Sequence, residues 1–428
     1  MRSARFVAVM AGVGVLALCG AVWADDFSSQ MSGNWNCKAQ KHYGDNTDKD
    51  VWGQGIGATG KTNPVPTPVE GGVNFPWAGD TGVVNAGHTV KFHTESHGGW
   101  YGTGEDPPAT LTVVLNGGTL GFTGESKYDD VSSPIRVQAP SAIAPQSVDD
   151  DGYDQRGGIS DYDGANTGKL TVVGSGKDMS LSGDQSGFSG GWDIGSNHLW
   201  FGAWEGNPGA GDGCLGTGTV EVNGGSLRFH YNAGTLNNAI ILGANGCEVE
   251  DGRGDLGKGT VTLAGPITGP GTLTVDADYA DRIKLTNGTS SYDGLLMKGG
   301  SSMVVQAPGA LGLLTTVQSG VLKLDNHGAS WDACDKDLVI TGGKVQYNTG
   351  VTDLTVHGLT LGTDTFPDGT YDIHTIYTSN EGNPVDFNNY FIGASTVVVK
   401  SGQLIPEPAG LGLIGLAGLA LLKRRRRP

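Results

Sequence analysis

The sequence predicts an all-β protein whose body, residues 25–400, is a β-solenoid built from short stacked strands. Its glycines, 74 of 428 residues, follow no Gly-X-Y period, which excludes a collagen helix. They separate short runs in which apolar and polar residues alternate, such as 111–115, 218–222 and 260–263. Runs of this kind, rich in Val, Leu and Thr, are typical of strands joined by tight turns. Between the two ends of the chain we find no run with helical periodicity, so we expect strands and turns throughout the body.

Internal repeats favour stacking of these strands in coils. A Gly-Gly phrase that leads into a strand pattern is found three times, at 116–122, 223–229 and 341–347. A longer match relates two pairs of segments at one common offset: 199–202 with 240–243, and 218–220 with 259–261. A period of this length predicts two stacked coils of roughly 20 residues each. Propeller blades repeat at a similar length, but the irregular spacing and the long acidic insertions disfavour a closed ring.

In such a solenoid each strand pairs in parallel with the equivalent strand of the next coil. Inward Val, Leu and Ile then stack into ladders, while Gly and Asn supply the positive φ that sharp corners require. The repeats are clearest at 199–275 and 267–312. Residues 123–165 and 363–390 are expected to be loops, because their strand pattern is weak.

The N-terminal segment, residues 1–24, has the features of a secretory signal peptide. Arg2 and Arg5 precede an apolar run, and small residues end at Ala24, after which we expect cleavage of this signal helix. A lipoprotein anchored through Cys19 is disfavoured because Leu18 stands where lipidation signals have a small side chain. We therefore expect export by the general secretion machinery.

The C-terminal segment, residues 401–428, combines a Pro-Glu-Pro motif, an apolar stretch at 409–422 and a basic cluster. As a helix the apolar stretch would be about 21 Å long, short of a hydrocarbon core of about 30 Å, so it predicts a weak, transient hold on the inner membrane. Basic residues at its end would remain in the cytoplasm. The motif is Pro406, Glu407 and Pro408, and the basic cluster is Lys423, Arg424, Arg425, Arg426 and Arg427.

This segment resembles the PEP-CTERM sorting domain of Gram-negative bacteria. The resemblance implies recognition by an exosortase, a membrane protease or transpeptidase that would cut near the Pro-Glu-Pro motif. It also implies that the processed body is exported to the cell surface or the extracellular medium. An ordinary tail anchor is the alternative interpretation of the same residues.

Three stretches of the body look like autotransporter-associated β-strand repeat proteins. They begin with Asn34-Trp35 and residues 76–90, continue through 267–312 with Thr268-Gly269-Pro270-Gly271-Thr272, and close with 354–399. The resemblance implies that the solenoid is a right-handed parallel β-helix. These motifs consist of strands and turns, so they imply a fold and no particular activity.

Charge limits the classes of partner. Loss of both end segments, with Glu407 in the tail, leaves 20 basic and 43 acidic residues, a net charge of −23. An acidic surface of this size repels phosphate backbones and anionic lipid, so nucleic acid is a poor candidate partner. Divalent cations and neutral polysaccharide remain compatible with it.

Four cysteines remain in the mature body, and an even number in an oxidising compartment permits two disulfides. Three pairings are open, and no pair has the CxxC spacing of a zinc or redox site. The four are Cys37, Cys214, Cys247 and Cys334.

Acidic clusters are the main metal candidates, because carboxylate oxygens at short spacing suit Ca²⁺. No EF-hand loop or calcium-binding nonapeptide is present, so Ca²⁺ is a candidate and no other cofactor is expected. His93 and His97 share a strand face, whereas His88 lies an odd number of residues from His93, so these histidines are interpreted as surface residues. The calcium candidates are Asp149, Asp151, Asp154, Asp276 and Asp278.

Two functions are open. The first is a non-enzymatic cell-surface or matrix protein associated with exopolysaccharide, because the sequence contains no catalytic constellation. The second is a secreted carbohydrate-active enzyme, a polysaccharide lyase or glycosidase on the same scaffold, with Asp129-Asp130 and Asp149-Asp150 as acid and base. An enzyme should have a lateral cleft lined by charged and aromatic side chains. The aromatic candidates are Trp100, Tyr101, Trp192, Trp200 and Trp204.

Overall fold

The computed structural model describes the body of the chain with several gaps. The predicted signal peptide, the sorting motif and the basic cluster at the C-terminus lie outside the described residues. The described ranges are 26–28, 33–36, 81–94, 112–124, 129–131, 133–145, 153–164, 168–174, 178–201, 213–229, 234–251, 260–276, 278–325, 330–348, 350–393 and 395–401.

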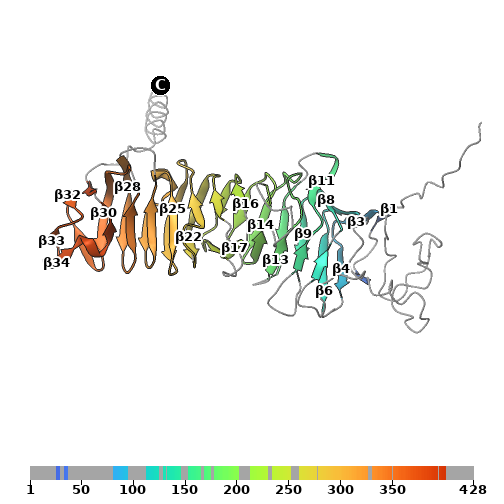
Figure 1. Ribbon diagram of the computed structural model, residues 1–428. Coiled ribbons are helices and arrows are strands. Elements are labelled where there is room, and N and C mark those ends of the chain that lie inside the picture. The colour runs from blue at the N-terminus through green and yellow to red at the C-terminus, as the bar shows by residue number, and fades with distance from the viewer. Residues whose placement is uncertain are drawn as a thin grey trace, which may run out of the picture.

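The body is a parallel β-solenoid, as the alternation of residues predicts. Figure 1 shows the strands stacked in a long row, with the N-terminal strands at one end and β32–β34 at the other. Each coil runs along three sides of the solenoid, here called faces 1, 2 and 3, and the chain follows them in the order 3, 1, 2. The strands of faces 1 and 2 belong to one 22-stranded sheet, and those of face 3 to sheets of five and seven strands. Pairing between successive coils is parallel on every face.

Most strands belong to a single face, and four longer ones run from face 1 into face 2. Face 1 contains β2 (Gly33–Asn36), β4 (Thr89–Thr94), β6 (Thr119–Gly124), β9 (Ser141–Ala144), β12 (Leu170–Val172), β14 (Trp192–Gly195), β16 (Val220–Val222) and β19 (Ile240–Leu242). Face 2 contains β7 (Asp129–Val131), β10 (Tyr153–Gln155), β13 (Asp178–Leu181), β15 (His198–Phe201), β17 (Gly225–Phe229), β20 (Cys247–Asp251) and β26 (Leu314–Val317). The longer strands are β22 (Ile267–Asp276), β24 (Ser291–Lys298), β28 (Ser330–Ile340) and β30 (Asp353–Leu361).

Face 3 has an N-terminal and a C-terminal group of strands. The first group is β1 (Asp26–Ser28), β3 (Thr81–Asn85), β5 (Thr112–Asn116), β8 (Ile135–Ala139) and β11 (Ile159–Asp161), which is followed by the short helix η2 (Tyr162–Gly164). The second group is β18 (Gly234–Leu236), β21 (Val261–Leu263), β23 (Ile283–Leu285), β25 (Ser302–Val305), β27 (Val321–Leu324), β29 (Lys344–Tyr347) and β35 (Phe391–Ile392). The helix η3 (Pro308–Ala310) lies between β25 and β26.

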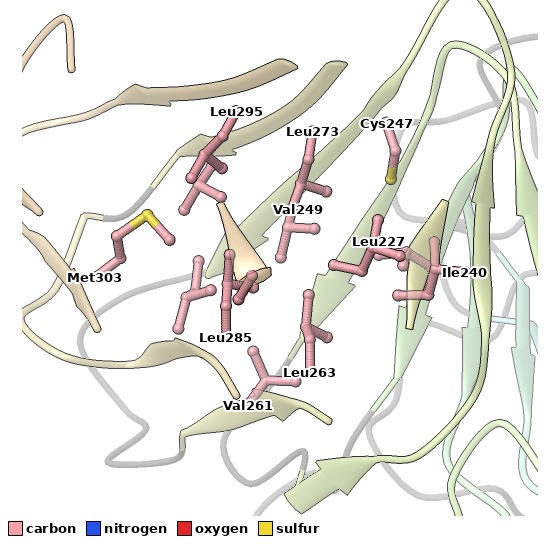
Figure 2. Close-up of a cluster of buried hydrophobic side chains, with 14 of the residues drawn as sticks. Leu227, Ile240, Cys247, Val249, Val261, Leu263, Leu273, Leu285, Leu295 and Met303 are labelled. Atoms are coloured by element: carbon pink, nitrogen blue, oxygen red, sulfur yellow. The ribbon is translucent and has the colours of Figure 1, made fainter. Parts of the chain in front are cut away.

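Alternate residues of a strand point into and out of the solenoid. The inward side chains of successive coils therefore stack in ladders along its length. On face 2 one ladder runs through Leu199, Leu227, Val249 and Val275, all fully buried. Figure 2 shows how side chains of this ladder meet those of faces 1 and 3 in the interior. The ladder also shows that coils differ in length, because more chain separates Leu199 from Leu227 than separates Leu227 from Val249.

The repeat found in the sequence between 199–220 and 240–261 does not relate strands that stack on one another, so this prediction is wrong. Leu199 lies in face 2, whereas Ile240, its counterpart in that repeat, lies in face 1 and pairs with Val220. Likewise Val220 lies in face 1 and Val261 in face 3. Strands on all three faces have similar short sequences, and the coils vary in length. Two similar sequences can therefore belong to different faces.

Glycine at the corners is confirmed where the backbone requires it. Gly117 and Gly224 belong to the Gly-Gly phrases at 116–122 and 223–229. Their φ values are +81° and +90°, a conformation that L side chains rarely adopt. Gly269, at φ +115°, also lies so close to the previous coil that a Cβ there would stand 2.2 Å from the Leu242 carbonyl oxygen. Glycine is therefore the residue that fits at these three corners.

The expectation of a loop at 123–165 is wrong, because the strands β7 to β11 lie there. Several of them are very short, and their hydrogen bonds go to the neighbouring coils. The Asp129-Asp130 pair therefore lies in β7, not in an insertion loop. Strands this short have too little periodicity to stand out, and the ladder that stabilises them depends on residues far away in the sequence.

The expectation of a loop at 363–390 is also wrong, because these residues form a cap of short strands over the last coil. They contain β31 (Asp364–Phe366), β32 (Gly369–Asp372), β33 (Ile376–Thr378), β34 (Pro384–Asp386) and η4 (Phe387–Asn389). Aromatic rings pack in this cap, with Phe387 stacked on Tyr371 at 5.5 Å and on Phe391 at 5.7 Å. The final strand, β36 (Thr396–Val399), pairs in parallel with β30 and antiparallel with β32. The cap thus protects the apolar interior at this end of the solenoid. Among the described residues, no helix has the length and apolar character needed to cross a membrane.

Candidate functional site

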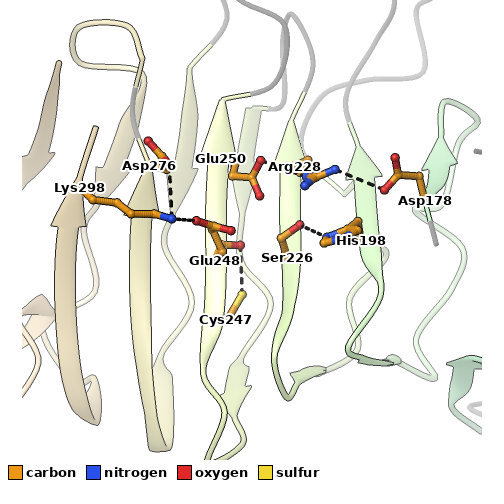
Figure 3. Close-up of polar contacts among 9 residues, drawn as sticks. All are labelled: Asp178, His198, Ser226, Arg228, Cys247, Glu248, Glu250, Asp276 and Lys298. Carbon is orange, nitrogen blue, oxygen red and sulfur yellow. Dashed lines mark hydrogen bonds and ion pairs between the residues drawn. The ribbon is translucent and has the colours of Figure 1, made fainter. Parts of the chain in front are cut away.

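The outward side of face 2 carries a row of polar and charged side chains across successive coils, here called the charged cluster (Figure 3). Strand alternation puts them there: residues two apart, such as Glu248 and Glu250, share the outward side because Val249 between them points inward. Parallel register then aligns each pair with its neighbours in the next coil. The cluster consists of Asp178, His198, Trp200, Ser226, Arg228, Glu248, Glu250, Asp276 and Lys298.

Arg228 connects three strands of the charged cluster. Its Nη1 atom lies 3.3 Å from Oδ1 of Asp178, and its Nε atom lies 3.1 Å from Oε2 of Glu250. Between these partners the guanidinium lies over the Trp200 ring, with Cζ 5.2 Å from the ring centroid. The Arg228 side chain is only 20% exposed, so its charge is both paired and largely removed from water. One face of the indole is therefore already occupied by a cation.

Lys298 forms the second ion-pair centre. Its ammonium group contacts Oε1 of Glu248 and lies 3.5 Å from Oδ2 of Asp276. The contact with Glu248 raises the pKa of Lys298 above its ordinary value. Each of the four carboxylates in the cluster thus has a cationic partner: Asp178 and Glu250 contact Arg228, and Glu248 and Asp276 contact Lys298.

The two glutamates of β20 titrate in opposite directions. Burial raises the pKa of Glu250, and the neighbouring Glu248 charge adds to this against the opposing effect of Arg228. Burial also acts to raise the pKa of Glu248, but hydrogen bonds with Lys298 and Glu250 and the charges of Lys298 and Arg228 together outweigh it, so that pKa falls below its ordinary value. The pair thus contains one carboxyl that holds its proton more strongly and one that holds it more weakly.

His198 stands beside these charges as a neutral group. Its Nδ1 atom lies 2.6 Å from Oγ of Ser226. Burial lowers the pKa of His198, and the charge of Arg228 lowers it further against the opposing effect of Asp178. The imidazole is therefore uncharged at neutral pH. With two cations and four carboxylates, the charged cluster has a net negative charge.

Of the aromatic residues named from the sequence, the structure describes Trp192 and Trp200, and these two do not line a common cleft. Trp192 is fully buried, and its Nε1 donates a hydrogen bond to the Leu215 carbonyl at 3.1 Å. Trp200 is the aromatic candidate that the structure places on an outward face. Trp100, Tyr101 and Trp204 lie outside the described residues. The expectation that Trp192 could stack on sugar is therefore wrong, because it belongs to the core.

The predicted calcium ligands do not come together in the part of the chain that the structure describes. Asp276 contacts Lys298, and Asp278 donates its backbone N–H to Oδ1 of Asp251 at 2.9 Å. Within the described ranges no three His, Cys, Asp or Glu side chains form a group that could hold a metal ion. Asp149 and Asp151 lie outside those ranges, as does the side chain of Asp154.

The cysteines are placed only in part. Cys214 and Cys247 are buried, whereas Cys37 and the side chain of Cys334 lie outside the described residues. Cys247 is a free thiol in the structure, and burial raises its pKa to about 12. A disulfide at Cys247 is therefore not formed here, and the pairing of the other cysteines stays a prediction.

Comparisons with known proteins identify no relative of this chain. A scan against models of protein families finds no match, and searches of curated proteins and of solved structures find none either. The fold is thus established by the structure, and function has to be argued from the chain's own residues.

Sequence reasoning missed most of the charged cluster. The signal was present in β20, where the alternation Cys247-Glu248-Val249-Glu250-Asp251 places two carboxylates on one side of a strand. Their partners Arg228 and Lys298 belong to other coils, and only the lengths of the intervening coils bring them beside β20. As arranged, the cluster can link coils by ion pairs and can present hydroxyl, imidazole and carboxyl groups to a ligand.

Proposed function

We propose that this protein is an exported, non-enzymatic component of the cell surface or extracellular matrix that associates with exopolysaccharide. Its segments 1–24 and 401–428 have the features of a signal peptide and of a PEP-CTERM sorting tail, and the resemblance to autotransporter-associated repeats is in keeping with a secreted solenoid. Exosortase and the general secretion machinery are the partners that these segments call for.

One observation carries the non-enzymatic part of the proposal: every carboxylate of the charged cluster has a cationic partner. Asp178 and Glu250 share Arg228, while Glu248 and Asp276 share Lys298. A carboxylate that links two coils through an ion pair is not free to reach a substrate proton, as a general base must be. The cluster is therefore better suited to holding coils together than to cleaving a glycosidic bond.

Incubation of the full-length chain with exopolysaccharide from the producing bacterium tests this proposal. Co-sedimentation of protein and polysaccharide is expected, with no increase in reducing ends or in unsaturated products over many hours. Mass spectrometry of the protein from the envelope and the medium should find no peptide that contains Arg427. Surface protein with an intact Arg427 would contradict processing, and failure to sediment would contradict the association.

A carbohydrate-active enzyme is the second candidate, and the opposed pKa values of Glu248 and Glu250 favour it. Two carboxyls with diverging pKa values are the arrangement in which one acts as acid and the other as base. If this candidate is correct, the wild type releases products from a polysaccharide and both Glu250→Gln and Glu248→Gln abolish the release. Ser226→Ala is the matched control, because it changes a neighbouring outward residue that is not a carboxyl.

A further inference from the structure

The outward side of face 3 differs in charge from the charged cluster. Four basic residues, here called the basic strip, lie there from the start of β23 to β29: Arg282, Lys284, Lys323 and Lys344. Parallel register places Lys284, Val304 and Lys323 in one row on successive coils. Ser302, Val321 and Lys344 form the adjacent row. Since coils are about 4.8 Å apart, Lys284 and Lys323 are separated by roughly 9.6 Å along the solenoid.

The side chains of the basic strip are held in place by their surroundings. Val304 points outward between Lys284 and Lys323 yet is only 5% exposed, as expected where the aliphatic stems of lysines cover an apolar neighbour. The Arg282 guanidinium lies over the Tyr279 ring, 4.1 Å from its centroid. Neighbouring groups thus limit where these cations can go, so less conformational entropy is lost when they bind an anion.

One carboxylate lies within the strip and balances part of its charge. Oδ2 of Asp281 is 2.7 Å from Nζ of Lys323, and its Oδ1 accepts a hydrogen bond of 2.7 Å from Oγ of Ser302. Burial acts to raise the pKa of Asp281, but Lys323, Ser302 and the charge of Lys284 outweigh it and lower that pKa. Asp281 therefore stays ionised, and the four cations of the strip still outnumber Asp281 and the bordering carboxylate of Asp325.

Amide groups and a second carboxylate, that of Asp325, border the strip on the side where the strands of face 3 end. Gln306 donates from Nε2 to Oδ2 of Asp325 at 3.3 Å, and Gln346 donates to Oδ1 of Asn348 at 3.3 Å. Amides can donate to and accept from hydroxyl groups, which are the commonest groups on a sugar. The strip thus offers cations in two rows and hydrogen-bonding groups beside them.

We propose that the basic strip is the docking surface for the exopolysaccharide, and that this polysaccharide is anionic, with carboxylate groups at regular intervals. The inference rests on the proposed function and names its ligand class. A linear polymer that lies along the solenoid would meet Lys284 and Lys323 two coils apart, and each ammonium could form a charge-assisted hydrogen bond. The net charge of −23 expected for the body would repel such a polymer at long range, but salt screens that repulsion, so the local positive charge of the strip would decide where the polymer docks. The acidic charged cluster would keep it away from face 2.

Binding of the full-length chain to two defined polymers tests the inference. Polygalacturonate carries a carboxylate on every sugar, and dextran is a neutral polymer. We expect binding to polygalacturonate that weakens as salt rises, and weaker binding to dextran. The double variant Lys284→Ser/Lys323→Ser should bind polygalacturonate about tenfold more weakly, because two charged contacts are lost.

The matched control is Lys169→Ser/Lys400→Ser, which removes the same charge from face 1, where Lys169 contacts Glu221 and the exposed Lys400 follows β36. It should bind polygalacturonate within about twofold of the wild type if local charge decides. Equal losses in both double variants would overturn the inference, since net charge alone would explain them. Thermal melts check folding, and the single variant Lys284→Glu repeats the test if loss of the Asp281 contact unfolds the double variant.

Other outcomes separate this inference from the proposed function. Dextran and native exopolysaccharide that bind equally well to wild type and to Lys284→Ser/Lys323→Ser would overturn the docking surface and retain the association. Absence of binding to every polysaccharide would overturn both. A single-stranded oligonucleotide that binds as tightly as polygalacturonate would also overturn the inference, because the strip would then select charge without selecting sugar.

Discussion

Faces 2 and 3 of the solenoid have similar inward chemistry and opposite outward charge. Leu227 and Val249 line the interior from face 2, and Leu263 and Leu285 line it from face 3, all 1% exposed or less. Outward, the charged cluster on face 2 has four carboxylates against two cations, whereas the basic strip on face 3 has four cations around Asp281. Because alternate residues point to opposite sides, packing of the interior restricts only the inward half of the residues in each strand. The other half is free to give each face its own partner.

The largest expected effect comes from the inward side. Leu227→Ala on face 2 and Leu285→Ala on face 3 should each lower the free energy of unfolding by about 2–5 kcal/mol, because both leave a cavity in a packed interior. Chemical denaturation of the two variants measures the loss. Ser226→Ala, next to Leu227 on the outward side, is the control. If one face tolerates its substitution and the other does not, the inward chemistry of the two faces is not equivalent.

The next effect separates the ion pairs of the two faces. Arg228→Ala should cost about 2 kcal/mol, because it leaves Asp178 and Glu250 without their partner in a site where the arginine is 20% exposed. Lys323→Ala on face 3 should cost less than about 1 kcal/mol, since its partner Asp281 is 41% exposed and water can replace the lysine. Urea unfolding at low and high salt measures both. A larger loss at Lys323 would reverse the predicted order.

A smaller effect concerns pH. The folded-state pKa of Glu250 is raised, so the folded chain holds this proton above the ordinary pKa of glutamate, and stability falls as pH rises through that window. Glu250→Gln has no carboxyl to ionise at this position and so lacks this loss of stability. The melting temperature of the variant minus that of the wild type should therefore increase as pH rises from 4 to about 7.

Glu248 provides the comparison of opposite sign. Its pKa is lowered, so its contribution is present above the ordinary pKa of glutamate and is lost as pH falls. Glu248→Gln should therefore be less stable than the wild type at neutral pH, with a difference that shrinks in acid. Parallel pH curves for the two variants would refute the assignment of directions within the pair.

The smallest expected signal is the reactivity of Cys247 on the inward side of face 2. Burial raises the pKa of this thiol to about 12, so little thiolate exists at pH 8. Under non-reducing conditions the native chain should not react at Cys247 with iodoacetamide, and the denatured chain should. Peptide mass spectrometry distinguishes the two states. Cys247 that stays unlabelled in the denatured chain until a reductant is added would indicate a disulfide in the native protein.

Sequence patterns predicted the fold because they are local. Gly117 and Gly224 mark corners, and alternation in runs such as 218–222 marks strands with one buried side. Pairing between coils is not local, since successive coils of face 2 differ in length. The contacts of Arg228 with Asp178 and Glu250 depend on that register, so the charged cluster could not be assembled from the sequence. Of its four acidic residues, only Asp276 is identified from the sequence, and it is identified there as a calcium ligand.

The last strand, β36, lies between two others, parallel to β30 and antiparallel to β32. It is also the strand that precedes the C-terminal segment 401–428, for which the sequence predicts a sorting tail. A force on that segment would reach β36 first, and β36 is hydrogen-bonded along both of its edges. Both ladders would have to break before such a force could separate the last strand from the solenoid.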